Sequence, residues 1–525
     1  MFFALKQVFS LRRIVFYSLS LSPLLYFIVN GNFLVDDWGQ LSNGLPLVNQ
    51  ISSWQSLWAY RPISWLVLPT ILNLFNDNFT LLAILHISLY IFSVFQLVSW
   101  EKLNFNLAQK YLASILLLSP VFASTFILSP VNQLSASVSL FLFALGLMCE
   151  KTGDKTRRAL FMTYFFFLLS LLSYEISLPL IFTHYLFIVL AKPRSILRIS
   201  VLPVVIALVV FWQKIIAVNL FNSDNSRLDN LSVIPFVSFI LTYLVSIPMA
   251  LIEGVFDKPY LVPAFLVLIA MVFRSFNIRE ANFSVNRQTK TVLFFGFLSS
   301  GLLFLLSGRY SLIDGYQNRG LTSSWILFSL LLISFLNQRK NLIMILILFV
   351  VSVNYVLFVG KIGDSVQAGE VRKTVVTQIL DKELLVNGSS STIILDLPCL
   401  LPTYSFRTEI FCASWDARGA LVNKGLGFDD VFVTGDTEDS LSRFLSVSRA
   451  QSDVQVVKFN DVFEIVRIDF LTPETQENLV RQVELNMIES EAKIEACKAK
   501  IAQLMRFQIS GSLSEYLSCA RHPLS

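Results

Sequence analysis

Residues 79–99 read FTLLAILHISLYIFSVFQLVS, a stretch without a single charged side chain. A helix needs about 17–25 apolar residues to span the hydrocarbon core of a bilayer, so this stretch predicts a membrane-spanning helix. The whole chain has a similar character: 54% of its 525 residues are hydrophobic, 15% are charged, and the mean hydropathy is +0.64. A soluble domain averages about 25% charged residues, which excludes an ordinary soluble enzyme.

The charged residues divide the chain into two parts. Residues 1–360 hold 24 Lys and Arg and 13 Asp and Glu, whereas residues 361–525 hold 17 and 23. The first part has the composition of a membrane bundle, and the second has that of a soluble domain large enough for its own core. We therefore predict an all-α polytopic membrane bundle over residues 1–360 and an extracytoplasmic α/β domain over residues 361–525.

About eleven transmembrane helices are predicted. Two further apolar stretches, 62–75 and 236–252, are interpreted as interfacial helices; the first is too short to cross comfortably. The predicted spans are 14–30, 79–99, 111–128, 134–149, 159–173, 176–191, 199–218, 259–273, 291–307, 320–336 and 342–360.

The orientation follows from the loops. With a cytoplasmic N-terminus, 18 of the 24 Lys and Arg of residues 1–360 fall in cytoplasmic loops, where positive charge is enriched. No small-x-small cleavage site follows the first apolar run, so it is predicted to be an uncleaved span. Eleven crossings then place the C-terminal domain outside the membrane. The modest net charge of +5 therefore reports topology, and no nucleic-acid partner is implied.

The C-terminal part alternates short apolar runs with helical patterns, and residues 474–506 predict one long charged helix. It holds four of the five cysteines. An even number in an oxidising compartment favours disulfides, most simply Cys399–Cys412 and Cys497–Cys519, although three pairings are open and four free thiols are the alternative. No zinc-binding or nucleotide-binding motif is present in the sequence.

Two adjacent carboxylates, Asp36 and Asp37, directly follow the first span in Phe33–Gly39 (FLVDDWG). Carboxylates beside a bilayer are costly, which favours a functional interpretation. One can accept a proton from an acceptor hydroxyl while the other holds a divalent cation. The alternative is a solvated turn with a helix-capping Asp.

The same loop continues into Trp54–Ile63 (WQSLWAYRPI). Trp and Tyr side chains favour the depth of the lipid headgroups, which predicts an interfacial position for Trp54, Trp58 and Tyr60. Arg61 is then placed to form a forked contact with a lipid phosphate. An aromatic belt with one snorkelling arginine is the alternative.

Together these features resemble a known superfamily. Its layout has a cytoplasmic N-terminus, one span, an outer Asp-Asp and an Arg-Pro opening the next apolar helix, matched here by Asp36-Asp37 and Arg61-Pro62. Residues 170–179 (SLLSYEISLP) resemble a Ser-Lys-Glu…Pro segment, with Tyr174 in place of Lys, and residues 307–310 (SGRY) resemble a late Arg-Tyr segment. The chain thus resembles the GT-C membrane glycosyltransferases over the layout of residues 1–360 and in these four short motifs.

The resemblance implies an enzyme that moves a sugar from a polyprenyl-phosphate carrier, such as undecaprenyl phosphate, to an extracytoplasmic glycan. The acceptor would be an envelope glycan such as the O-antigen of lipopolysaccharide, and the location a bacterial inner membrane. Transfer by a single displacement inverts the anomeric centre and needs no covalent intermediate.

Roles for individual residues follow from the same resemblance. Asp36 or Asp37 is the expected base, and the other orients the acceptor or holds Mg²⁺ or Mn²⁺; no cofactor is certain. Glu175 is expected to be a further acidic ligand or an acceptor contact. The candidates for the donor phosphate are Arg61, Arg309, Tyr310, Arg319 and Lys214. The candidates for acceptor or interface contacts are Trp38, Trp54, Trp58 and Tyr60.

Two other functions remain open. A flippase or transporter of lipid-linked glycans should show internal repeats or helices broken at matching positions, and the sequence shows no such symmetry. A glycan polymerase shares the span count, but such enzymes more often carry their key residues in large, later outer loops. The early Asp-Asp pair therefore favours the glycosyltransferase.

Overall fold

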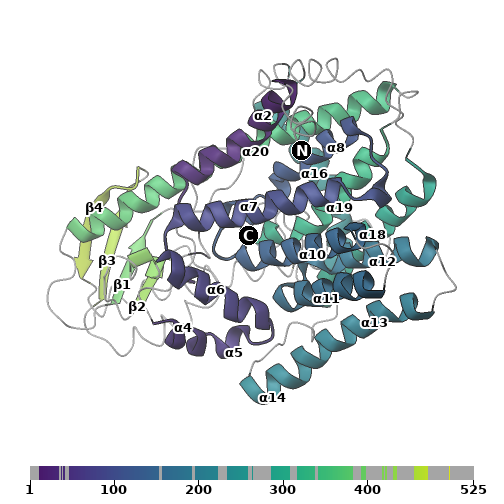
Figure 1. Cartoon of the computed structure of the whole chain (residues 1–525). Helices are drawn as coiled ribbons and strands as arrows, with labels where there is room; N and C mark the ends of the chain where they lie inside the picture. Colours follow the sequence, from purple (N-terminus) through teal and green to yellow (C-terminus); the bar gives the residue numbers. More distant parts are fainter. Residues whose placement is uncertain are drawn as a thin grey trace.

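The structure is a computed structural model of the whole chain, and it is mostly helical (Figure 1). It describes residues 11–34, 37, 40–41, 46–152, 157–191, 196–222, 233–257, 263, 266, 285–307, 316–336, 341–381, 392–397, 417–418, 420–421, 430–433, 454–460, 462–470 and 496.

The longer helices form one bundle. They are α2 (Leu11–Asn30), α7 (Phe79–Val98), α8 (Leu107–Leu118), α10 (Leu134–Thr152), α11 (Arg157–Ser173), α12 (Leu178–Ala191), α13 (Ile196–Phe211), α15 (Val233–Leu241), α16 (Ile247–Asp257), α18 (Arg287–Ser307), α19 (Thr322–Ser334) and α20 (Asn341–Asp381).

Shorter helices and helical turns connect them. They are α4 (Leu47–Ser53), α5 (Gln55–Trp58), α6 (Pro62–Phe75), η1 (Glu101–Leu103), η2 (Val121–Ala123), α9 (Thr125–Leu128), η3 (Glu175–Ser177), α14 (Ala217–Phe221) and η8 (Tyr316–Leu321), with two π-helical turns, η4 (Trp212–Ile216) and η6 (Thr242–Ser246).

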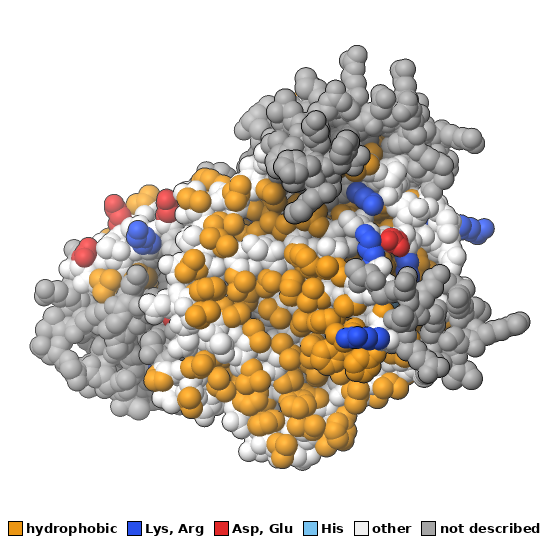
Figure 2. Space-filling view, in the orientation of Figure 1, with side chains coloured by type: hydrophobic (Ala, Val, Ile, Leu, Met, Phe, Trp, Pro, Cys, Tyr) orange, Lys and Arg blue, Asp and Glu red, His pale blue; other side chains and the backbone are white. Residues whose placement is uncertain are grey.

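Six helices in the described part of the chain are long and apolar enough to cross a membrane: Phe79–Val98, Leu134–Lys151, Ser200–Phe221, Val233–Glu253, Arg287–Leu305 and Ile343–Asp381. Figure 2 shows a broad area of hydrophobic side chains over the middle of the bundle, with most of the visible charged side chains towards the two ends. Charged ends on either side of an apolar middle are expected of a bundle that spans a bilayer.

Two predicted segments differ from the structure. The segment 111–128 was predicted to be one span, but α8 ends at Leu118 and is followed by short helical turns. Ser119 precedes Pro120, whose ring disfavours a helical conformation of the residue before it, and Ser119 adopts φ −124° and ψ 62°. The segment 236–252 was predicted to be interfacial, but it lies in the continuous helix from Val233 to Asp257, which is long enough to cross.

Other predictions are met or lie outside the described residues. The 14 residues of α6 form the short helix predicted over 62–75. Proline at its first position favours the start of the helix, and Asn76, in the left-handed conformation (φ 49°) after its last residue, favours its end. Of the predicted span 259–273, only Pro263 and Leu266 are described, and the long helix predicted over 474–506 is described only at residue 496.

A four-stranded sheet lies at one end of the bundle. Its strands are β1 (Thr392–Asp396), β2 (Asp430–Val433), β3 (Val454–Phe459) and β4 (Ile465–Phe470), in the order β2-β1-β3-β4. The central strand β1 pairs in parallel with β2 and β3, and β4 is antiparallel to β3. Figure 1 shows this sheet at the end of the bundle where α4, α5 and α6 lie, and we call this end the sheet end.

Helix α20 joins the bundle to the sheet. It continues without a break through residue 360, where the sequence predicts a domain boundary. Its Gln378 side chain donates to the carbonyl of Phe463 (3.0 Å) and accepts from the amide of Ile465 (2.8 Å), next to β4. These two hydrogen bonds attach α20 to the β3–β4 hairpin.

One apolar core, which we call the outer core, connects the elements of the sheet end. It contains side chains from the first connecting loop, from α6, from the start of α10, from the distal half of α20 and from the sheet, including Phe33, Leu68, Leu134, Val376 and Leu395. Burial of such side chains contributes about 25 cal/mol per Å², so these elements are held as one unit.

Candidate functional site

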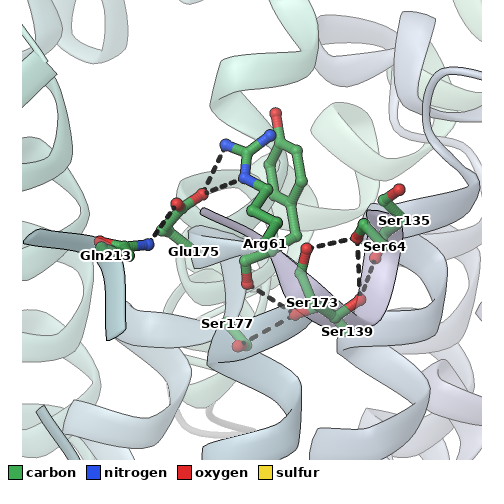
Figure 3. Close-up of polar contacts among 9 residues, drawn as sticks. Arg61, Ser64, Ser135, Ser139, Ser173, Glu175, Ser177 and Gln213 are labelled. Carbon is green, nitrogen blue, oxygen red and sulfur yellow. Dashed lines mark hydrogen bonds and ion pairs between the residues drawn. The ribbon is translucent and has the colours of Figure 1, made fainter. Parts of the chain in front are cut away.

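An ion pair lies where α5 meets α6 at the sheet end. The Nε and Nη2 atoms of Arg61 donate to Oε2 of Glu175, at 2.9 and 2.5 Å (Figure 3). The side chain of Arg61 is 4% exposed and that of Glu175 is 31% exposed. Sequence analysis named both residues, which stand 114 positions apart, and the structure brings them into direct contact.

Aromatic rings surround the guanidinium of Arg61. Its central carbon lies 3.8 Å from the ring centroid of Tyr174, 4.9 Å from that of Tyr60 and 5.8 Å from that of Trp58. A cation over an aromatic face is stabilised by about 0.5–2 kcal/mol, depending on its solvation. Burial alone would lower the pKa of Arg61, but the Glu175 carboxylate and, to a smaller extent, Tyr60 and Tyr174 outweigh it, so the pKa is raised and the cation is retained.

Gln213 completes this arrangement from a π-helical turn. Its Nε2 donates to Oε1 of Glu175 (3.1 Å), while the indole of the preceding Trp212 donates to the carbonyl of Ala59 (2.9 Å). Both residues belong to η4, which interrupts the apolar helix α13–α14. Such π-helical turns are frequent at functional sites because they shift side chains from their regular positions. Here the turn brings α13–α14 against Glu175 and against Ala59, two residues before Arg61.

Buried serines shape the corner that presents Glu175. Helix α11 ends at Ser173, and Tyr174 is extended (φ −160°, ψ 140°), so the last carbonyls of the helix need partners from elsewhere. The Ser64 hydroxyl donates to the carbonyl of Ser173 (2.5 Å), and the Ser139 hydroxyl donates to that of Tyr174 (2.8 Å). The position of Glu175 is therefore fixed by side chains of α6 and α10 (Figure 3).

Asp37 is fully buried and accepts four hydrogen bonds. Its Oδ1 accepts from the hydroxyl of Ser129 (2.7 Å) and the amides of Val131 (3.0 Å) and Asn132 (2.9 Å). Its Oδ2 accepts from the amide of Leu34 (3.1 Å). Burial raises the pKa of Asp37 to about 6, although these bonds, led by that of Asn132, oppose the shift. This carboxylate fastens the first connecting loop to the turn before α10.

The Asp37 contacts and the ion pair meet through α10. Residues 129–132, which bind Asp37, lie just before this helix. On its first turn, the carbonyl of Ser135 accepts from the hydroxyl of Ser173 (3.1 Å), two residues before Glu175. Asp37 and the corner with Glu175 therefore rest on adjacent stretches of the chain, residues 129–132 and the first turn of α10.

The predicted metal site does not fit Asp37. Four N–H or O–H donors face its two oxygens, and a cation bound there would meet their positive ends. Within the described residues there is no group of three or more His, Cys, Asp or Glu side chains that could hold a metal ion.

Of the other predicted site residues, some are described by the structure and the rest lie outside the described residues. Lys214 is half-buried in η4 next to Gln213, and Arg319 is half-buried in η8, which packs against η2 and α9. The Trp54 ring lies 6.3 Å from that of Trp58. The predicted residues outside the described ones are Asp36, Trp38, Arg309, Tyr310, Cys399, Cys412, Cys497 and Cys519.

Sequence analysis missed Gln213 and most of the serines. Gln213 carries a usable signal, because a polar side chain within an apolar helix is costly unless it has a partner. Ser170, Ser173 and Ser177 are three and four residues apart, a spacing that suggests one helix face, although α11 ends at Ser173 and Ser177 belongs to η3. Ser64 and Ser139 carry no such signal, since their partners come from another helix.

Comparison with family models, with curated proteins and with solved structures finds no match to this chain.

Proposed function

We propose that this protein is an integral membrane glycosyltransferase that moves a sugar from a polyprenyl-phosphate carrier to an extracytoplasmic glycan. The observation that carries the proposal is the cluster of Arg61, Glu175 and Gln213 under aromatic rings, at the end of the bundle that also holds Asp37. A bacterial inner membrane, an undecaprenyl-phosphate donor and lipopolysaccharide O-antigen as acceptor are the specific form of this proposal.

The topology in this proposal places the sheet end outside the cytoplasm. Thr289 at the start of α18 donates to the carbonyl of Lys102 (3.3 Å), and Gln109 in α8 donates to that of Ile333 near the end of α19 (3.4 Å), so these helix ends lie together. They belong to the Lys- and Arg-rich loops expected in the cytoplasm. The extracytoplasmic α/β domain of residues 361–525 is part of the same proposal.

If α15–α16 crosses in place of the predicted span 259–273, the number of crossings stays at eleven. The C-terminal part then remains on the side of the sheet end, as the sequence predicts. This substitution changes which apolar segment crosses the membrane, but the site stays on the same side of the membrane.

The chemistry needs a base for the acceptor and a positive charge for the departing phosphate. Asp36 is the proposed base, because Asp37 already accepts four hydrogen bonds. The acceptor hydroxyl gives its proton to Asp36, and its oxygen forms a bond to the anomeric carbon. The bond from that carbon to the phosphate oxygen breaks, and its electron pair leaves with the phosphate beside Arg61. One displacement of this kind inverts the anomeric centre.

The test is transfer of labelled sugar from undecaprenyl-phosphate donors to envelope glycan fractions. Asp36→Asn is expected to abolish transfer, because an amide cannot take the proton. The matched control is Asp77→Asn, in the turn between α6 and α7 at the same end of the bundle. Asp77 has φ 51°, a conformation that Asn adopts readily, and this variant should transfer at the wild-type rate.

Full activity of Asp36→Asn would contradict the assignment of the base. If the wild type consumes no donor but moves lipid-linked glycan across vesicle membranes, the protein is a transporter and the proposed enzymatic function is wrong.

A further inference from the structure

The ion pair between Arg61 and Glu175 uses only part of each side chain. Both donated hydrogen bonds of Arg61 end on a single oxygen, Oε2 of Glu175. The other terminal nitrogen, Nη1, makes no hydrogen bond to any residue that the structure describes. A guanidinium offers five N–H donors and commonly binds carboxylate or phosphate through two of its nitrogens. The pair therefore leaves donor capacity on a buried, charged group.

We infer that this ion pair is exchangeable, and that an anionic phosphate headgroup displaces Glu175 from Arg61. In the structure the Glu175 carboxylate occupies the anion-binding position beside Arg61. When the donor binds, the phosphate of the polyprenyl carrier takes this position. The inference rests on the proposed function, which supplies the phosphate. It adds that the site carries its own competing anion.

The exposure of the two partners supports exchange from one direction. Glu175 is 31% exposed, whereas Arg61 is 4% exposed, so an incoming anion reaches the carboxylate side first. Separating a partly exposed carboxylate from its cation costs less than separating a fully buried one, because water already solvates the exposed part of the carboxylate. Glu175 is thus the partner that leaves, and Arg61 is the one that stays.

The surroundings hold each partner after separation. The rings of Tyr174, Tyr60 and Trp58 keep the guanidinium in place without a carboxylate. Gln213 remains bound to the other oxygen of Glu175, which limits how far that side chain swings. After exchange, Glu175 lies beside the bound phosphate, and its Oε2, no longer bound to Arg61, can accept from a substrate hydroxyl. Donor binding would in this way prepare a contact for the sugar or the acceptor.

A second ion pair in the bundle provides a matched control. Glu150 of α10 binds Lys102 through one oxygen (2.5 Å) and His184 through the other (2.9 Å). Its side chain is 32% exposed, close to the value for Glu175, and it belongs to the end opposite the sheet. Glu150→Gln thus removes an equally exposed, paired carboxylate without touching Arg61.

The experiment measures binding of undecaprenyl monophosphate to the purified full chain in detergent, with the neutral polyprenol as comparison. Glu175→Gln keeps the size of the side chain and removes the competing charge. We expect it to bind the phosphate about fivefold more tightly than the wild type, the effect of removing a partly exposed ion pair. Glu150→Gln should bind as the wild type does, and Arg61→Gln together with Glu175→Gln should lose the gain.

Equal or weaker phosphate binding by a folded Glu175→Gln protein would overturn the inference, and so would equal binding of the neutral polyprenol. If Glu175→Gln fails to fold, Glu175→Asp takes its place, since it keeps the charge but shortens the arm, and it should also bind more tightly than the wild type. Tighter phosphate binding with no sugar transfer from any donor would retain the exchange and refute the proposed function.

Discussion

The substitution Asp37→Ala tests whether the carboxylate of Asp37 anchors the first connecting loop or takes part in the reaction. The substitution leaves four donors without their acceptor: the hydroxyl of Ser129 and the amides of Leu34, Val131 and Asn132. Each buried donor left unsatisfied costs about 1–3 kcal/mol. Part of that loss is offset, because the substitution also removes a buried charge. We expect a net loss of about 2–4 kcal/mol of unfolding free energy at neutral pH.

Asp37→Asn is the matched variant. Its Oδ1 keeps the three bonds from residues 129–132, and its amide meets the Leu34 amide, so one bond is lost. The buried charge is lost too, so the net change should stay within about 1 kcal/mol.

The pH dependence follows from the pKa of Asp37, which burial raises from an ordinary value of 3.8 to about 6. The folded chain then holds the Asp37 proton more tightly than the unfolded chain does. This contribution to stability is complete below about pH 3.8 and is lost as the pH rises through 6. The difference corresponds to about 3 kcal/mol, and Asp37→Asn should lack it.

The assay is reversible unfolding in mixed micelles of detergent and SDS, followed by tryptophan fluorescence between pH 4 and 8. Transfer of sugar is measured on the same preparations. A loss of less than about 1 kcal/mol for Asp37→Ala, together with complete loss of transfer by both variants, would refute the anchoring role and make Asp37 a reacting group.

The remaining predictions concern α20. Gly369→Ala should destabilise the chain by about 1–3 kcal/mol, because its Cβ would lie 2.7 Å from that of Asn32. Gly363→Ala on the same helix meets no atom within 4 Å and should add about 0.5–1 kcal/mol in the same unfolding assay; equal effects would contradict the contact. Arg372→Met should cost about 1–3 kcal/mol, because it removes a buried donor to the carbonyl of Phe33 (2.9 Å). Faster amide exchange near Phe33 in that variant, measured by mass spectrometry, is the second expected result, and unchanged exchange would show that the bond does not hold the loop.

The sequence was most informative where a costly residue stood in an apolar setting. Arg61 and Glu175 were both predicted as site residues, and they prove to be partners. The sequence could not show that they bind each other, because the contact depends on the corner at Tyr174 and on serines from two other helices. It also could not show that the oxygens of Asp37 are occupied, since three of the four donors come from residues 129–132, more than 90 positions away.

The errors in the fold have local causes. The end of α8 was readable from Pro120, but the apolar run on both sides of it outweighed that signal. The helix from Val233 to Asp257 was underestimated: the prediction covered residues 236–252, although the apolar stretch begins at Val233. The sheet could be foreseen only as an α/β pattern, because β1 pairs with strands about 40 and 60 positions further along the chain. Such pairing depends on tertiary contacts that local periodicity does not encode.

Helix α20 makes the sheet end sensitive to the bilayer itself. At 1.5 Å per residue, its 41 residues measure about 60 Å, roughly twice the thickness of a hydrocarbon core. Half of the helix therefore stands outside the lipid as a rigid arm, with the sheet at its far end. A tilt of about 10° in the embedded half would swing that end by about 5 Å. Because the sheet shares one apolar core with α6, which begins directly after Arg61, such a tilt would move them together, and membrane thickness would set the distance of both from the lipid surface.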